Sequence, residues 1–85
     1  MTQTISKNPI NFATGKEYRN DNAQLLLDAM KQNNYSSNEF ATMKQWNAQN
    51  ETVRKGQKGV RITFESRAGE TVAFLFNREQ LVVYE

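Results

Sequence analysis

The chain has 85 residues, a formal net charge of +2 and 38% hydrophobic residues, enough for one domain with a modest core. It contains no cysteine and no histidine, which excludes disulfides, Cys/His metal sites and Ser-His-Asp or Cys-His catalysis. No apolar run could cross a bilayer, and the polar N-terminus does not resemble a secretory signal. We therefore expect a cytoplasmic protein with no membrane partner, no cofactor and no enzymatic activity.

The N-terminal part of the sequence predicts a tail followed by a small hairpin. We expect a flexible tail over 1–8 and a single domain over 9–85. The apolar–polar alternation over 10–12 is typical of a short strand, and Gly15 supplies the left-handed residue of the turn that follows. Tyr18 should therefore return beside this first strand.

A first helix should begin at Asp21 or Asn22 and end near the two asparagines at 33–34, which suit a left-handed stop. Asp21 and Gln24 match the capping-box pattern. Apolar side chains recur at helical spacing in this segment and form one stripe, made of Ala23, Leu26, Leu27 and Met30. We expect this stripe to face the core.

The next segment can be read in two ways. Positions 36 and 39, and again 42 and 45, match the capping-box pattern as Ser-x-x-Glu and Thr-x-x-Gln. Either one helix runs over 37–49, or a short turn precedes a helix that Thr42 caps. In both cases the i, i+3, i+6 spacing predicts one shared core face for Phe40, Met43 and Trp46.

The last third of the sequence predicts β-structure. Apolar and polar residues alternate over 60–65, which indicates a half-buried strand. A turn over 67–70 leads into a second strand over 71–76. Residues 77–80 should form a turn or a single helical turn, and 81–84 a third strand or a packed tail. The predicted fold class is α+β, with two helices packed on a small antiparallel sheet of about three strands.

A basic segment with two glycines separates the helical and β parts. Residues 53–61 carry four cations and no anion, with Gly56 and Gly59 among them. Glycine lets the backbone approach a partner closely, and cations interleaved with free amides suit a phosphate chain. A solvated turn is the plainer alternative. On the first interpretation, the phosphate contacts come from Arg54, Lys55 and Lys58.

Other polar and aromatic residues could complete such a surface. Tyr18 is the best candidate for stacking against a base, although it could instead be a half-buried hairpin residue. Beside it in the sequence lie Thr14, Arg19 and Asn22, of which Asn22 could instead cap a helix. If Thr42 caps the second helix, first-turn amides would form an anion site beside Lys44 and Gln45.

Four short blocks between residues 14 and 80 occur in a recognisable order. They are T-G-K-E-Y-R with a following Asn22, F-A-T-M-K-Q, V-R-K-G-Q-K-G and F-N-R-E-Q. This series resembles the blocks T-G-x-x-Y-R-G-x-N, W-L-T-F-K-Q, V-R-K-G-E-K-G and F-N-x-x-Q of the N-terminal domain of ArdC-type antirestriction proteins. The chain departs from that pattern at Asn20, at Phe40 and at 50–51, where the family has Gly, Trp and Gly-Gly.

The resemblance implies an α+β domain that binds single-stranded DNA. In ArdC proteins this domain precedes a zinc metallopeptidase-like domain with an H-E-x-x-H motif, which a chain without histidine lacks. We therefore expect non-sequence-specific binding of single-stranded DNA, in a phage, prophage or plasmid protein linked to antirestriction or DNA protection. The expected DNA-binding residues are Thr14, Tyr18, Arg19, Asn22, Lys44, Gln45, Arg54, Lys55 and Lys58.

The alternative belongs to a different functional class. A domain of this size could inhibit a host defence nuclease through a protein–protein interface, and a host defence protein would then be its partner. The mark of that function would be an exposed apolar patch with mixed charge rather than a basic surface.

Overall fold

Four strands and two helices make up the fold in the computed structural model, which describes residues 8–83. The strands form one mixed sheet in the order β1-β2-β4-β3, in which β1 runs parallel to β2 and the other neighbours are antiparallel. The predicted α+β class is confirmed, whereas the sheet has four strands rather than about three. In chain order the elements are β1 (Ile10–Asn11), α1 (Asn20–Gln32), β2 (Glu39–Thr42), α2 (Met43–Ala48), β3 (Val60–Ser66), β4 (Gly69–Asn77) and the short 3-10 helix η1 (Arg78–Gln80).

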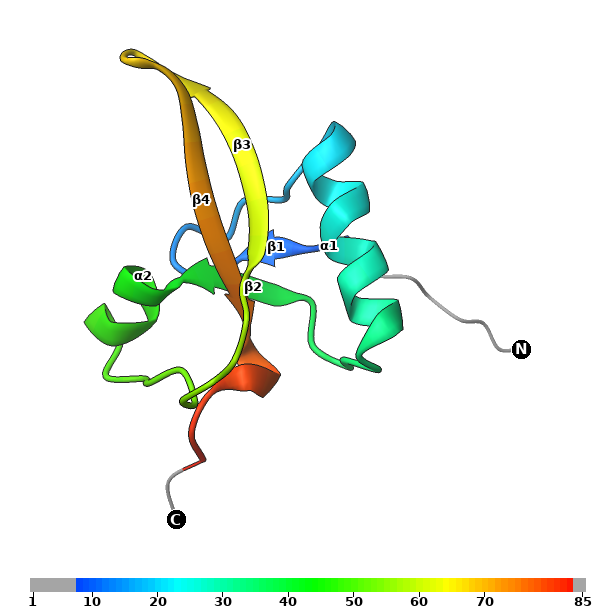
Figure 1. Ribbon diagram of the computed structural model, residues 1–85, viewed down its shortest axis with the longest axis vertical. Coiled ribbons are helices and arrows are strands. Elements are labelled where there is room, and N and C mark those ends of the chain that lie inside the picture. Colours follow the sequence, from blue (N-terminus) through cyan, green and yellow to red (C-terminus); the bar gives the residue numbers. More distant parts are fainter. Residues whose placement is uncertain (1–7, 84–85) are drawn as a thin grey trace.

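The long β3–β4 hairpin confirms the strands that the sequence predicts over 60–65 and 71–76, and it extends both. Its register pairs Val60 with Leu75 and continues to Ser66 opposite Gly69. The hairpin projects beyond the rest of the molecule (Figure 1). Its base joins β2 through β4 and therefore lies over the core, whereas its far end is exposed.

The segment before α2 is a strand, so the single helix over 37–49 is wrong, whereas the helix capped by Thr42 is confirmed without the predicted short turn before it. Thr42 does cap a helix, because its hydroxyl accepts from the Gln45 amide at 3.1 Å and the Gln45 side chain accepts from the Thr42 amide at 3.0 Å. Before Thr42, however, the chain forms strand β2, in which successive side chains point to opposite faces of the sheet. The predicted common face therefore does not form: Phe40 and Trp46 are buried in different clusters, and Met43 is 47% exposed.

Helix α1 begins at Asn20, earlier than predicted, and without the expected capping box. Its N-cap is Arg19, which makes no side-chain cap bond. The Gln24 amide instead donates to the Asp28 carboxylate one turn later, at 2.9 Å. The predicted stripe does face the core through Leu26, which is fully buried. The left-handed stop is also confirmed, because the residue at position 34 has a φ of 55°.

The predicted N-terminal hairpin is confirmed in outline. Ile10 pairs with Glu17 in an isolated antiparallel bridge, and Gly15 has a φ of 75°. The Tyr18 amide donates to the Pro9 carbonyl at 2.9 Å. Of the predicted tail over 1–8, only the last residue is described. At the other end of the chain, Leu81 is buried and bridges Val53, whereas Val83 is 79% exposed, so only the start of the predicted packed tail is packed. Position 84 lies outside the described residues.

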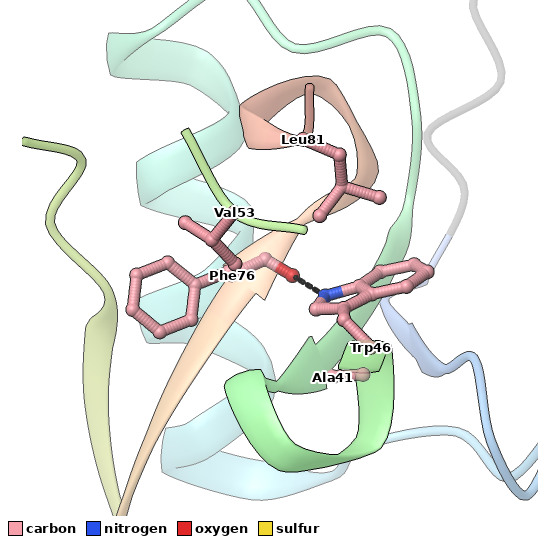
Figure 2. Packing of buried hydrophobic residues seen from close by; sticks show 5 residues of the cluster. All are labelled: Ala41, Trp46, Val53, Phe76 and Leu81. Atoms are coloured by element: carbon pink, nitrogen blue, oxygen red, sulfur yellow. Dashed lines mark hydrogen bonds between the residues drawn. The ribbon is translucent and has the colours of Figure 1, made fainter. Parts of the chain in front are cut away.

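Two hydrophobic clusters lie on opposite faces of the sheet, because neighbouring residues of a strand point to opposite sides. The face toward α1 carries Leu26, Phe40, Ile62 and Leu75. The face toward α2 carries Ala41, Trp46, Val53, Phe76 and Leu81 (Figure 2). In this second cluster the Trp46 indole nitrogen donates to the Phe76 carbonyl at 2.9 Å, and the Phe12 ring stacks on the indole at a centroid distance of 4.6 Å. Trp46 is therefore a core residue as predicted, although not through a face shared with Phe40 and Met43.

Candidate nucleic-acid interface

A pocket of about 550 Å³ lies where the N-terminal hairpin, the starts of α1 and α2, and the β3–β4 hairpin meet. We call it the hairpin pocket. Its apolar floor comes from the α1-facing side of the sheet and consists of Ile62, Phe64, Ala73 and Leu75. Its polar walls include Asn11 and four of the nine residues that the sequence predicts as DNA contacts, namely Thr14, Tyr18, Asn22 and Gln45.

Asn11 connects the polar walls of this pocket, although the sequence analysis does not select it. Its amide nitrogen donates to the Tyr18 hydroxyl at 2.8 Å and to the Gln45 side-chain oxygen at 3.1 Å. Its own oxygen accepts from the Thr14 amide at 2.9 Å. Both N–H groups of the Asn11 side-chain amide thus donate, and its oxygen accepts one hydrogen bond. The available signal was a polar residue between two apolar ones, directly before the Thr-Gly turn.

Tyr18 is half-buried, as the hairpin interpretation of this residue predicts, and its stacking against a base stays a prediction. Burial raises the pKa of its phenol above 10.0, and the hydrogen bond from Asn11 lowers the pKa by a smaller amount. The phenol is therefore neutral near pH 7 and keeps a proton to donate. Asn22 does not cap α1. Its amide nitrogen donates to the Thr63 carbonyl at 2.8 Å and so ties the start of α1 to β3.

The basic loop, residues 53–59, lies at the other end of α2. Its backbone makes a turn in which the Gln57 amide donates to the Arg54 carbonyl at 3.3 Å and Gly56 has a φ of 85°. Arg54 is partly used by the fold, because its guanidinium donates to the Glu79 carbonyl at 2.9 Å. Lys55 and Lys58 have exposed side chains. This loop therefore presents two lysines on a defined turn.

Gln80 holds the basic loop in place. Its side chain is 3% exposed, and its amide nitrogen donates to the Lys58 carbonyl at 2.8 Å and to Gln57 Oε1 at 3.3 Å. Its side-chain oxygen accepts from the Asn77 amide at 2.8 Å, and its carbonyl accepts from the Arg54 amide at 2.9 Å. The F-N-R-E-Q block is thus the anchor of the V-R-K-G-Q-K-G block, a relation that their separation in sequence conceals.

The predicted residues therefore form two sets rather than one surface. The first set lies in the hairpin pocket, with two exposed cations at nearby helix starts, Arg19 at the N-cap of α1 and Lys44 in the first turn of α2. The second set is Arg54, Lys55 and Lys58 in the basic loop. Helix α2, six residues and about 9 Å long at 1.5 Å per residue, lies between Thr42 and the basic loop in the chain. The Gln45 backbone amide donates to the Thr42 hydroxyl, so the predicted anion site has one donor fewer.

The two regions differ in charge. Lys16 and Glu17 both line the hairpin pocket, so cation and anion offset each other there. The basic loop itself, residues 53–59, contains cations and no anion, and the Asp28 carboxylate of α1 lines the same pocket as Lys58. Among the described residues, no group of acidic side chains could hold a metal ion, and no helix is long and apolar enough to span a membrane.

The fold and these anchored blocks define a small α+β domain of the kind found at the N-terminus of antirestriction proteins. A family model described as the N-terminal domain of anti-restriction factor ArdC matches residues 1–79. The chain therefore belongs to this family, as its four sequence blocks indicate.

Solved structures share this fold, and one curated protein is similar in sequence. Crystal structures of the antirestriction ArdC protein from the R388 plasmid match with TM-scores of 0.74 in the metal-free form and 0.78 in the Mn(II)-bound form. Each is 24% identical and is matched over 88% of this chain, but over 32% and 31% of the ArdC chains. The uncharacterized protein y4eC of Sinorhizobium fredii (strain NGR234) is 36% identical over 56 residues, which are 66% of this chain and 18% of that protein. The chain thus spans a third or less of these relatives.

Proposed function

We propose that this domain binds single-stranded DNA with little sequence preference. We also propose that it belongs to a protein of a phage, prophage or plasmid that acts in antirestriction or DNA protection. The observation that carries the proposal is the basic loop, whose backbone is fixed by the buried Gln80 and whose Lys55 and Lys58 side chains are exposed. Membership of the ArdC N-terminal family supports the antirestriction part of this proposal.

The loop suits a phosphate backbone for two physical reasons. First, a turn that is already ordered loses little conformational entropy when it binds, so more of the electrostatic attraction remains as affinity. Second, no atom lies within 4 Å of where a side chain would begin at Gly56, so a strand can approach the backbone there. Contacts to phosphate carry no sequence information, and this agrees with weak sequence preference.

A salt titration tests this proposal. We expect fluorescently labelled single strands to bind more tightly than duplexes of equal length. Three to five phosphate contacts would give a slope of log K against log salt of roughly −2 to −3.5, at about −0.7 per phosphate. Replacing Lys55 and Lys58 with Ala should make the slope shallower by about 1.4 and weaken all sequences alike.

The matched control removes two exposed cations from elsewhere, Lys31 at the end of α1 and Arg67 at the hairpin turn. It changes the net charge equally, so it should alter the slope much less. Equal effects of the two double variants would refute a localised site. Tighter binding to duplexes, or no binding at low salt, would refute the function itself.

One observation favours the alternative function, inhibition of a host defence protein. On the α2-facing side of the β3–β4 hairpin, Val72 and Phe74 are 44% and 52% exposed, and Arg61 lies directly opposite Phe74. Exposed apolar residues beside a charge are typical of protein interfaces. If the domain inhibits a host defence nuclease through this surface, replacing Val72 and Phe74 with Thr should abolish the inhibition. The same replacements should leave DNA binding unchanged.

A further inference from the structure

We infer that the hairpin pocket holds one base of a bound single strand, and that it favours a base with a carbonyl group, namely thymine, cytosine or guanine, over adenine. This inference rests on the proposed binding of single-stranded DNA. It adds a base-dependent contribution to the sequence-independent contribution of the basic loop.

The orientation of the Gln45 amide is fixed by its partners. Its oxygen accepts from two donors, the Asn11 amide nitrogen at 3.1 Å and the Thr42 backbone amide at 3.0 Å. The reversed amide would place its NH₂ group against both donors, so this arrangement is disfavoured. The Gln45 nitrogen therefore lies at the free end of the amide, and it donates to no acceptor among residues 8–83.

The Tyr18 hydroxyl provides a second donor by the same logic. Asn11 must direct its oxygen toward the Thr14 amide, so its nitrogen faces the Tyr18 oxygen, which accepts at 2.8 Å. The phenolic proton then has no acceptor in the described part of the chain. Since burial keeps Tyr18 neutral, this proton is available. Asn11 is accordingly a positioning residue that prepares two donors for a ligand.

The remaining lining favours a neutral flat ring over a phosphate. Four apolar side chains form the floor, and Phe64 among them is still 44% exposed, so it offers a face for stacking. Lys16 is offset by Glu17 at the same pocket, and the carboxylate would repel a phosphate. The volume of about 550 Å³ lies within the usual range of small-molecule sites, about 300–1,000 Å³.

The two donors set the base preference. A carbonyl oxygen has two lone pairs and can accept from both donors. Thymine, cytosine and guanine carry such an oxygen, whereas adenine has no carbonyl group and offers only ring nitrogens, each with one lone pair in the plane of the ring. A ring nitrogen can accept from one of the two donors and leaves the other without an acceptor. The pocket should therefore favour thymine, cytosine and guanine over adenine by the free energy of about one net hydrogen bond.

The test uses a short single strand of abasic residues that carries one base at its centre. All such strands have the same phosphates, so the strand without any base measures the loop alone. We expect thymine, cytosine or guanine to tighten binding by about two- to tenfold over adenine, which corresponds to one net hydrogen bond of about 0.5–1.5 kcal/mol. Equal affinities for all four bases and for the fully abasic strand would overturn the inference, even though the proposed function would stand.

Gln45→Glu is the sharpest variant. A Glu at this position keeps the capping box with Thr42 and the acceptor for Asn11, but it replaces the free donor with an oxygen. The added negative charge should weaken the binding of all strands alike. The ratio of the affinity for the thymine strand to the affinity for the adenine strand should fall toward one. Tyr18→Phe should reduce the same ratio without a change of charge. Circular dichroism verifies the fold. Retention of the full ratio in both folded variants would refute the assignment, and failure of every wild-type strand to bind would refute the proposed function instead.

Discussion

Gln80 links the stability of the C-terminal half to the position of the basic loop, so its replacement makes a direct test of this arrangement. Gln80→Met keeps a side chain of similar length but removes the amide. The buried Asn77 amide then loses its acceptor at 2.8 Å, and the Lys58 carbonyl loses its donor at the same distance. Lys58 is exposed, so water can replace the donor there.

The expected magnitude follows from the Asn77 amide alone. Asn77 is fully buried, and leaving a buried donor without a partner costs about 1–3 kcal/mol. For a domain of this size, each kcal/mol lowers the melting temperature by about 4–8 °C. The variant should therefore remain folded at 25 °C but melt at least about 4 °C lower. It should also bind single strands more weakly, because the loop loses its tether at Lys58.

The assays are thermal unfolding and titration with labelled oligonucleotides. Gln57→Met is the matched control, because Gln57 contacts the same amide at 3.3 Å from an exposed position. Its effect on stability should stay within about 0.5 kcal/mol. If Gln80→Met were no less stable than Gln57→Met, the proposed role of Gln80 as the anchor of the loop would be wrong.

Two further predictions concern the core and the two tyrosines whose pKa is raised in the fold. Trp46→Ala should lower the free energy of unfolding, measured in urea, by about 3–5 kcal/mol. The indole is fully buried, stacks on Phe12 and donates a hydrogen bond to the Phe76 carbonyl. A stable variant that loses only DNA binding would contradict this core role. Burial raises the pKa values of Tyr18 and Tyr35 in the folded state, so the neutral form stabilises the fold below pH 10, and stability should fall as the pH rises beyond it. A pH series of melting temperatures should show a smaller decrease above pH 10 for Tyr18→Phe than for the wild type.

The local patterns in the sequence predicted those elements whose stabilising contacts are local. The β3–β4 hairpin and the helix capped by Thr42 are examples, since alternation and capping act within a few residues. Strand β2 was missed because four residues carry little periodicity and its partners lie far away in sequence. The capping-box pattern at positions 36 and 39 wrongly indicated the start of a helix, for a related reason. Glu39 forms an ion pair with Arg78, and this distant partner takes the side chain that a capping box would need.

The candidate site was predictable by residue type but not by arrangement. The cations of the basic loop were evident from composition, and the tyrosine and polar residues of the pocket from the family blocks. Nothing local indicated that these residues would form two sets, or that Gln80 would hold the loop. Asn11 was missed because its importance lies in bonds to Tyr18 and Gln45, and the second of these is 34 residues away.

The departure from the family pattern at Asn20 can be tested through its backbone conformation. Asn20 has a φ of 58° at the start of α1, where the family pattern has glycine, and asparagine adopts this left-handed region more readily than most residues. The same replacement recurs in the Gly-Gly position of the pattern, where Asn50 has a φ of 63°. The substitutions therefore keep the backbone conformation that glycine would supply.

Asn20→Ala should lower the free energy of unfolding by about 1 kcal/mol, since left-handed conformations cost most residues about 1–2 kcal/mol, whereas Asn20→Gly should change it by less than about 0.5 kcal/mol. Thermal unfolding measures both. Asn47→Ala is the control, because Asn47 lies within α2 and is exposed, where alanine is favoured. Because Asn20 sets the direction in which α1 leaves Tyr18, the alanine variant should also loosen the contact between Asn22 and the Thr63 carbonyl and weaken strand binding. Full stability of Asn20→Ala would mean that α1 does not begin with a left-handed residue in solution.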